Sequence, residues 1–155
     1  MVIVMIRVIS VGKRNEPWVD EGVREYQKRL DKRFGLEWVL IPNSAKSGLE
    51  GPKDEAQRIL KSVDEHDFVI LLDERGKCID SPALSKLLAA QTETGRRVVI
   101  VIGGAYGVSD EVRSRADFVW SLSDLVFPHQ LVRLILTEQI YRAQEIYMGR
   151  PYHHE

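Results

Sequence analysis

The chain has 155 residues, enough for one compact domain with a sizeable buried core. Apolar residues make up 44% and charged residues 29%, a mixture that is typical of soluble globular proteins. The 22 Lys and Arg residues nearly balance the 23 Asp and Glu residues, so the formal net charge is −1. Most nucleic-acid-binding proteins carry a basic surplus instead. Any contact with nucleic acid must therefore come from a local basic cluster, from dimerisation that doubles such a cluster, or from recognition of a folded shape.

The single cysteine, Cys78, excludes an intramolecular disulfide and a metal site built from several cysteines. The apolar segment 1–11 is short, is interrupted by Arg7 and lacks a small-residue cleavage site. It therefore predicts a first strand rather than a signal peptide. No apolar run approaches the roughly 18 residues needed to span a bilayer. These features predict a cytoplasmic protein with no membrane segment and no metal site.

Apolar runs and helical stripes alternate along the first four-fifths of the chain. Runs rich in Val and Ile predict strands at 3–11, 36–41, 68–72, 97–102 and 118–121. Helical spacing, capping residues and first-turn prolines predict helices at 18–34, after Pro52, at 82–92 behind the N-cap Asp80, and after Ser109. Because the strands are apolar on both faces, the pattern predicts an α/β fold whose largely parallel sheet is flanked by helices. No segment is typical of a domain boundary, so residues 1–155 are predicted to form one domain.

The last predicted helix, 129–148, carries apolar residues on two sides. Leu131, Leu134 and Ile135 lie on one side, and the other side carries Val132, Leu136, Ile140, Ala143 and Tyr147. One side is expected to pack on the sheet of the same chain. A helix that is apolar on two sides must bury both of them. A second copy of the chain, related by a two-fold axis, would cover the remaining side. The sequence therefore favours a homodimer, with a central helix in a monomer as the alternative.

Three irregular segments are expected at the carboxyl edge of the sheet, where parallel α/β sheets bind their ligands. They are 72–76, 102–107 and 122–128. The third is rich in apolar residues, has no helical period and ends in proline. Its backbone groups need partners if the segment is buried. A ligand with an adenine edge would supply them, with the apolar side chains closing over its faces.

The glycines at 103, 104 and 107 do not follow a dinucleotide-binding pattern. That pattern requires G-x-G-x-x-G directly after the first strand, where only Gly12 is present. A phosphate-binding G-x-x-x-x-G-K-[ST] loop is absent from the sequence. A plain turn would explain any one of these glycines. Their combination with the segment 122–128 favours a ligand site.

Several short motifs together resemble a known family. They are Val11-Gly12-Lys13, Leu72-Asp73, Ile102-Gly103-Gly104-x-x-Gly107, Ser121-Leu122-Ser123 to Phe127-Pro128-His129, Tyr141-Arg142-Ala143 and Pro151-Tyr152-His153. The chain resembles the RlmH family, SPOUT-class methyltransferases that modify N3 of a pseudouridine in large-subunit ribosomal RNA. The resemblance covers the entire chain, and its most specific part is the C-terminal third.

The resemblance implies an α/β fold with a C-terminal trefoil knot, a homodimer, and S-adenosylmethionine bound in the knot. It implies cofactor contacts, mostly through backbone groups, from Leu72, Gly103, Gly104, Leu122, Ser123, Asp124, Leu125, Val126 and Phe127. It implies contacts with the RNA substrate from His129, Arg142, Tyr152, His153 and His154.

Arg142 and His153 are the candidate catalytic residues. Arg142 would orient the base and stabilise developing negative charge. A helix salt bridge to Glu138 or Glu145 is the open alternative for this arginine. Tyr152 and the histidines after it would contact RNA by stacking and hydrogen bonding. A frayed terminus is the alternative for that tail.

Two other functions stay open at this point. One is a nucleotide-dependent oxidoreductase on a doubly wound sheet, and the other is a non-catalytic ribosome-binding module with the same fold. The nearly neutral net charge favours the assembled ribosome over free RNA as the substrate, because shape would then select the target.

Overall fold

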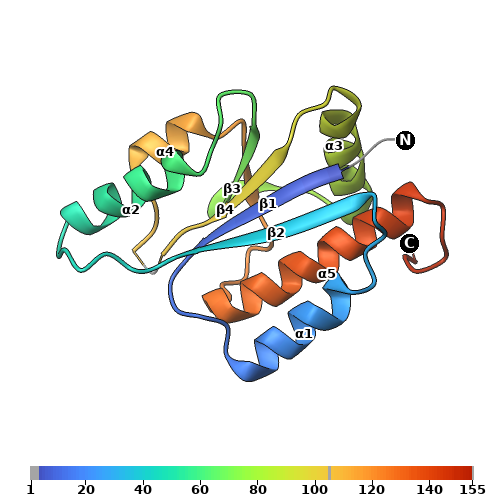
Figure 1. The fold of residues 1–155 in the computed structure, drawn as a ribbon, viewed down its shortest axis with the longest axis horizontal. Helices are drawn as coiled ribbons and strands as arrows, with labels where there is room; N and C mark the ends of the chain where they lie inside the picture. The colour runs from blue at the N-terminus through green and yellow to red at the C-terminus, as the bar shows by residue number, and fades with distance from the viewer. Residues whose placement is uncertain (1–3, 105, 155) are drawn as a thin grey trace.

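A computed structural model describes residues 4–104 and 106–154. All four strand pairs of its five-stranded sheet are parallel, and helices cover both faces (Figure 1). The strands are β1 (Val4–Val11), β2 (Phe34–Ile41), β3 (Phe68–Cys78), β4 (Val98–Ile102) and β5 (Phe118–Ser121). The helices are α1 (Pro17–Gln27), α2 (Glu50–Lys61), α3 (Ser81–Glu93), α4 (Asp110–Arg115) and α5 (His129–Tyr147). The predicted fold class is confirmed. Ile3, predicted in the first strand, and Ala105, in the glycine-rich turn, lie outside the described residues.

The strand order β2-β1-β4-β3-β5 places β4 in the middle of the sheet. Every residue of β4 is buried, as the apolar run on both faces predicted. Side chains alternate between the faces. Val98, Ile100 and Ile102 point to one face and pack under α3 and α5. Val99 and Val101 point to the other face and pack under α2 and α4. The sheet is therefore the central layer between two helical layers.

The first predicted helix is too long. It was expected to reach Phe34, but α1 ends at Gln27 and Phe34 is the first residue of β2. A residue of α5 stabilises the intervening turn, because the backbone N–H of Asp31 donates to Oε1 of Gln144 at 2.6 Å. Leu30 and Phe34 both pack in the same core. The four-residue spacing of Leu30 and Phe34 matches a helical pattern, but Leu30 lies in a turn and Phe34 lies in a strand.

β3 extends further than the apolar run 68–72 predicted. Leu72 pairs with Trp120 of β5, the register then shifts, and Lys77 pairs with Trp120 again. Gly76 lies against the β5 backbone, since a Cβ atom there would be 2.6 Å from the carbonyl oxygen of Val119. The segment between Leu72 and Gly76 is therefore a bulge at the edge of β5, and only glycine fits at its end.

α5 packs between α1 and α3 on one face of the sheet (Figure 1). Leu136 and Ile140 are buried against the strands. Leu134 covers Gly22 of α1, because a Cβ atom on Gly22 would lie 2.7 Å from its Cδ1. Leu134 is therefore covered by α1 of the same chain. The homodimer and the trefoil knot stay predictions.

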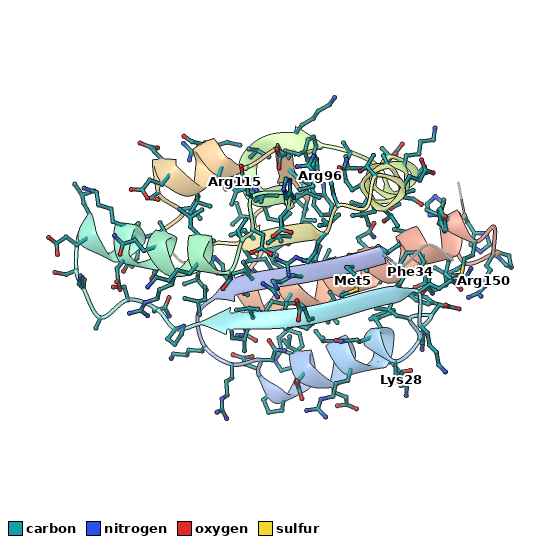
Figure 2. The ribbon with its side chains drawn as sticks, turned by 45° about the horizontal axis from the view of Figure 1, so that its top comes forward. Met5, Lys28, Phe34, Arg96, Arg115 and Arg150 are labelled. Atoms are coloured by element: carbon teal, nitrogen blue, oxygen red, sulfur yellow. The ribbon has the colours of Figure 1, made fainter. Side chains whose placement is uncertain are left out.

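The amino-terminal edge of the sheet is a network of paired charges. Arg97, just before β4, donates from Nε and Nη2 to the two carboxylate oxygens of Asp67, just before β3, at 3.0 and 2.7 Å. Burial raises the pKa of Asp67, but hydrogen bonds from Arg97 and from the Asp64 amide outweigh burial, and the net pKa falls below its usual value. Arg115, labelled in Figure 2, donates to the carbonyl oxygen of Asp67 at 2.9 Å. This edge is closed by its own residues.

In the part of the chain that the structure describes, no helix is both long and apolar enough to cross a bilayer.

Candidate functional site

A cavity of about 670 Å³ lies at the carboxyl edge of the sheet. Ser10 on β1, Ile102 on β4 and Leu72 on β3 are paired in one row, and Leu72 also pairs with Trp120 on β5. These four residues therefore lie at one level of the sheet, where β4 ends and the bulge of β3 begins. The volume is within the range of roughly 300–1,000 Å³ that is common for small-molecule sites. Its position is the one predicted from the parallel sheet.

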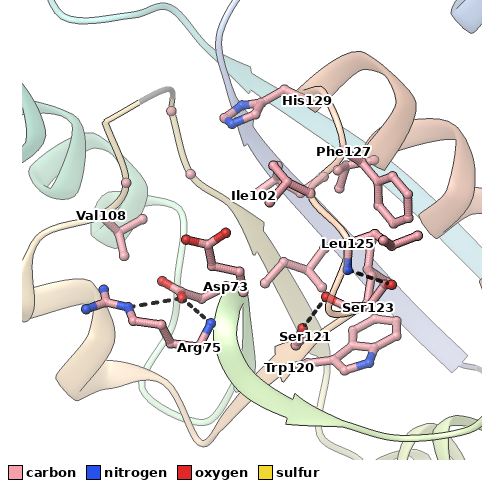
Figure 3. A pocket seen from close by; sticks show the side chains of 18 of the residues that line it. Asp73, Arg75, Ile102, Val108, Trp120, Ser121, Ser123, Leu125, Phe127 and His129 are labelled. Carbon is pink, nitrogen blue, oxygen red and sulfur yellow. Dashed lines mark hydrogen bonds and ion pairs between the residues drawn. The ribbon is translucent and has the colours of Figure 1, made fainter.

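The segment 122–128 forms one wall of this cavity (Figure 3). Two local hydrogen bonds hold its turn: Oγ of Ser121 donates to the carbonyl oxygen of Ser123 at 2.9 Å, and the N–H of Leu125 donates to Oγ of Ser123 at 3.0 Å. The turn presents Leu125 and Val126 to solvent, with 70% and 78% of their surfaces exposed. Two adjacent exposed aliphatic side chains at a cavity mouth are suited to cover an apolar ligand face.

The glycine-rich turn after β4 forms the opposite wall. A Cβ atom on Gly103 would lie 2.6 Å from Cγ1 of Val108, and one on Gly104 would lie 3.1 Å from Oε1 of Glu55. Gly107 has φ +82°, a conformation that favours glycine. Packing within the turn therefore requires glycine at 103, close contact with Glu55 of α2 favours it at 104, and the backbone conformation favours it at 107. A larger residue at Gly103 would distort the wall rather than project into the cavity.

Asp73 places a carboxylate in the cavity directly after Leu72 (Figure 3). Its Oδ2 accepts from Nη2 of Arg113 at 2.6 Å, and its Oδ1 accepts from the N–H of Arg75 at 2.8 Å. Burial raises the pKa of Asp73, but these hydrogen bonds outweigh it and lower the pKa overall. The carboxylate is therefore ionised and held in one orientation, ready to accept a hydrogen bond from a ligand. Sequence reasoning missed Arg113, which is far from Asp73 in the chain and carries no motif.

His129, the first residue of α5, also lines the cavity and is half-buried (Figure 3). Burial lowers the pKa of its imidazole, and the positive charge of Arg133 lowers it further. The ring is therefore neutral near pH 7 and can accept a proton or a hydrogen bond.

A buried polar atom at the cavity has no partner among the described residues. Nε1 of Trp120 is fully buried and makes no hydrogen bond. Oγ of Ser109 is also without a partner, so this residue occupies the predicted cap position of α4 but makes no capping bond. Buried donors without acceptors are uncommon in native proteins. The indole N–H of Trp120 is thus a buried donor, on a residue that lines the cavity, which no described residue satisfies.

A second cavity of about 580 Å³ adjoins the first, and Trp120 and Leu122 line both. Its other walls come from the turn before α3, from α5 and from the C-terminal tail. Ile135 is the α5 residue that contributes apolar surface, and His153 and His154 are the tail residues. The two predicted histidines therefore lie beside the first cavity but do not enter it in this chain.

Arg142 joins the tail to α5. Its Nε and Nη2 donate to Oε1 of Glu138 at 2.9 and 2.6 Å, so the predicted alternative of a helix salt bridge is present. Its guanidinium also lies 4.8 Å from the ring centroid of Tyr152, and its Nη1 is 3.2 Å from Nδ1 of His153. Because a guanidinium only donates, Nδ1 of His153 accepts and the proton of the neutral ring is on Nε2. Neither Arg142 nor Tyr152 lines the first cavity.

Tyr152 is a fixed part of this cluster rather than a frayed end. Its hydroxyl donates to Oε1 of Glu138 at 3.1 Å, and its ring packs edge-on against Tyr141 with the centroids 4.8 Å apart. Burial and the charge of Glu138 raise the pKa of Tyr152 to about 12.

All the predicted cofactor residues except one line the first cavity. These are Leu72, Gly103, Gly104, Leu122, Ser123, Leu125, Val126 and Phe127. The exception is Asp124, whose Oδ1 lies 4.0 Å from Sγ of Cys78. Within the described residues, no group of three or more His, Cys, Asp or Glu side chains could hold a metal ion.

The chain resembles known methyltransferases over nearly its whole length. Residues 4–153 match the family model described as predicted SPOUT methyltransferase. Ribosomal RNA large subunit methyltransferase H of Desulfitobacterium hafniense is 44% identical over 156 residues, covering 96% of this chain and 98% of the relative. The protein of the same name from Alkalilimnicola ehrlichii is 42% identical over 152 residues, covering 96% of this chain and 97% of the relative.

A solved structure has the same fold. It is a probable methylase family protein from Haemophilus influenzae Rd KW20, which matches with a TM-score of 0.58 over 97% of this chain and 70% of that chain. Sequence identity in this pair is 13%, so the likeness concerns the fold alone. With the family match and the close relatives, the conclusion is that the chain belongs to the SPOUT methyltransferase family and, within it, to the family of ribosomal RNA large subunit methyltransferase H.

Proposed function

We propose that this protein transfers a methyl group from S-adenosylmethionine to N3 of a pseudouridine in large-subunit ribosomal RNA. The assembled ribosome in the cytoplasm is the proposed substrate, and residues 1–155 are proposed to act as one SPOUT methyltransferase domain. The observation that carries the proposal is the cavity at the carboxyl edge, with an apolar wall at 122–128 in a chain of this family.

The residues of the first cavity fit S-adenosylmethionine. The irregular backbone of 122–128 offers N–H and C=O groups for the adenine edge, and Leu125 and Val126 offer apolar cover for its faces. Asp73 offers an ionised carboxylate for ribose hydroxyls or for a positive charge. When bound there, S-adenosylmethionine supplies a methyl group that is already activated by its sulfonium. The task of the chain is then to position the two reactants in line.

The target N3 must lose its proton as the new bond forms. His129 is neutral, lines the cavity and can accept a hydrogen bond or proton on that side. Arg142 is proposed to orient the base and to stabilise the developing negative charge, and Glu138 raises the pKa of Arg142, so the guanidinium stays charged. His153 presents its Nε2–H away from Arg142, where it can contact the same base.

A homodimer would bring these residues together. Within one chain the Arg142 cluster lies outside the first cavity, so one chain does not assemble both halves of the proposed site. A two-fold pairing through the face that carries Ile135 and the second cavity would bring Tyr152, His153 and His154 of one subunit to the cofactor cavity of the other. We propose this shared arrangement.

Incubation with labelled S-adenosylmethionine and ribosomes from cells lacking this protein tests the function. One methyl group on N3 of a pseudouridine of the large subunit is expected. Binding of the cofactor without transfer would instead support a non-catalytic ribosome-binding module. Calorimetry that shows tight NAD binding and no S-adenosylmethionine binding would overturn the proposal in favour of an oxidoreductase, an alternative against which the family membership argues.

A further inference from the structure

The loop 12–16 between β1 and α1 is fastened to the first turns of α5. Nη1 of Arg133 donates to the carbonyl oxygen of Lys13 at 2.7 Å and to Oδ1 of Asn15 at 2.9 Å. Nε2 of Gln130 donates to the carbonyl oxygen of Arg14 at 3.2 Å. These bonds fix the loop backbone, while the side chains of Lys13 and Arg14 are exposed.

Uncompensated positive charge gathers at this loop. In the part of the chain that the structure describes, every arginine except Arg14 and Arg133 pairs with a carboxylate. Lys13 likewise makes no ion pair within the described residues, and the carboxylate of Glu16 accepts instead from Nε1 of Trp18 at 2.7 Å. The carboxylate of Glu16 is the one negative charge of the loop, so Lys13, Arg14 and Arg133 together leave a positive surplus there, in a protein whose net charge is −1.

Arg133, buried beneath the loop, adds to the positive potential of the loop. It is 1% exposed, and its hydrogen bonds go to neutral oxygens only, including Oγ of Ser10 at 2.9 Å. A buried cation without a carboxylate is costly, and its field is weakly screened. Gly12 allows this arrangement, since a Cβ atom there would lie 3.3 Å from Nη2 of Arg133. An anion that approaches the loop would compensate this charge.

The loop adjoins the cofactor cavity. His129, which lines the cavity, lies one turn before Arg133 on α5. Ser10, which accepts from Arg133, is paired with Ile102 in the row of residues at the cavity floor. An extended polyanion bound at the loop would thus pass next to the reacting centre.

We propose that Lys13 and Arg14 bind phosphate groups of the RNA strand that carries the target nucleotide, on a loop held in place by Arg133. This inference rests on the proposed function, because it takes the substrate to be RNA. The loop is then the local basic cluster that a chain of nearly neutral net charge needs in order to contact nucleic acid. Exposed cations on a fixed backbone bind phosphate with little loss of conformational freedom.

The test measures KM for ribosomes lacking the methyl group as a function of KCl at constant Mg²⁺. The variant is Lys13→Gln with Arg14→Gln, and the matched control is Lys53→Gln with Lys86→Gln, two exposed lysines on α2 and α3 that also make no ion pair in the described structure. Each phosphate contact contributes about 0.7 to 0.9 to the slope of log affinity against log salt. The loop variant is therefore expected to lower the slope by about 1.5 and to raise KM about tenfold near 0.1 M salt. Its affinity for S-adenosylmethionine and its melting temperature should match the control.

A salt slope equal to that of the control would overturn the inference even when methyl transfer itself is intact. Failure of the proposed function has a different result, in which the unmodified protein transfers no methyl group to any ribosome. A photo-crosslinking amino acid at position 14 identifies the partner directly in the assembled ribosome. Crosslinks to RNA near the methylated nucleotide support phosphate binding, whereas crosslinks to a ribosomal protein alone overturn it.

Discussion

The two edges of the sheet differ in how their buried polar and charged groups are paired. At the amino edge, Asp67 and Arg97 satisfy each other, and Oδ2 of Asp117 accepts from the N–H of Val69 at 2.8 Å. At the carboxyl edge, the indole N–H of Trp120 has no partner in the described structure, and the buried Arg133 meets only neutral oxygens. An edge that is closed by its own residues contributes to stability, whereas an edge with spare donors and charge is prepared for ligands.

This difference separates stability from function in space. Substitutions at the amino edge should change the free energy of unfolding and leave binding alone. Substitutions of the exposed side chains at the carboxyl edge, such as Leu125, should do the reverse, because these side chains contact solvent or a ligand rather than the core. The predictions that follow test this separation, beginning with the largest expected effect.

Deleting residues 152–155 should abolish methyl transfer while affinity for S-adenosylmethionine stays within about twofold, because the first cavity does not include the tail. A mixed dimer locates the missing half of the site. One subunit lacks the tail, and its partner carries Leu125→Asp in the cofactor cavity. Shared sites leave one intact tail beside one intact cavity, so about half of the normal activity is expected. An inactive mixed dimer that is folded and binds cofactor at its intact cavity would rule out sharing.

Leu125→Asp by itself should weaken S-adenosylmethionine binding about 100-fold, since a charge would replace apolar cover over the ligand. The side chain is 70% exposed, so the free energy of unfolding should change by less than about 0.5 kcal/mol. Calorimetry and denaturant unfolding measure the two quantities. Leu49→Asp is the matched control, because Leu49 is 84% exposed and lies outside the cavity. Equal binding by both variants would contradict the assignment of the wall 122–128.

Arg97→Met should lower the free energy of unfolding by about 2 kcal/mol, because the buried carboxylate of Asp67 loses its guanidinium. Kinetics of the folded variant should be normal. Arg58→Met is the control, since it breaks a more exposed pair, with Asp54 one helical turn away, and should cost less than Arg97→Met. Urea unfolding at neutral pH compares them. A loss of cofactor affinity in Arg97→Met without a loss of stability would break the proposed separation of the two edges.

The smallest expected effect concerns His129 and pH. Its folded-state pKa is lowered, first by burial and then by Arg133, so the unfolded chain takes up this proton at a higher pH than the folded chain. Above the unfolded pKa near 6.5, His129 is neutral in both states and does not make the free energy of unfolding depend on pH. As the pH falls from there through the folded pKa, proton uptake by the unfolded chain lowers the free energy of unfolding. His129→Gln should therefore lose less stability than the unmodified protein between about pH 6.5 and pH 5. Melting temperatures across this range, with exposed His66→Gln as control, show whether the curves differ as expected.

Much of the fold was accessible from local sequence patterns. The strand at 118–121 is confirmed at both ends, and Asp80 caps α3 by accepting from the N–H of Ala83 at 2.8 Å. The segment 122–128 was singled out because it is apolar and has no helical period, and it forms a cavity wall. Each of these features depends on residues that are neighbours in the chain.

Other features depend on contacts between distant segments. Phe34 has helical spacing to Leu30 yet begins a strand, because Gln144 holds the turn between them. The pairing of Asp73 with Arg113 joins residues that no local pattern connects. Arg142 was rightly suspected of a salt bridge to Glu138, but its contact with Tyr152 required the tail to fold back on α5.

The sequence by itself determined the alternation of elements, the parallel sheet and the carboxyl-edge position of the ligand segments, because periodicity, caps and turns are encoded within a few residues. Only the tertiary structure decided which charges are compensated. Arg133 reads in the sequence as one more helix cation, but folding buries it against Ser10 and the loop 12–16, with no carboxylate beside it. Electrostatic pairing depends on which residues are neighbours in space. The positive charge of the loop beside the cavity therefore follows from the packing of α5 against the end of β1 and could not be predicted from the sequence.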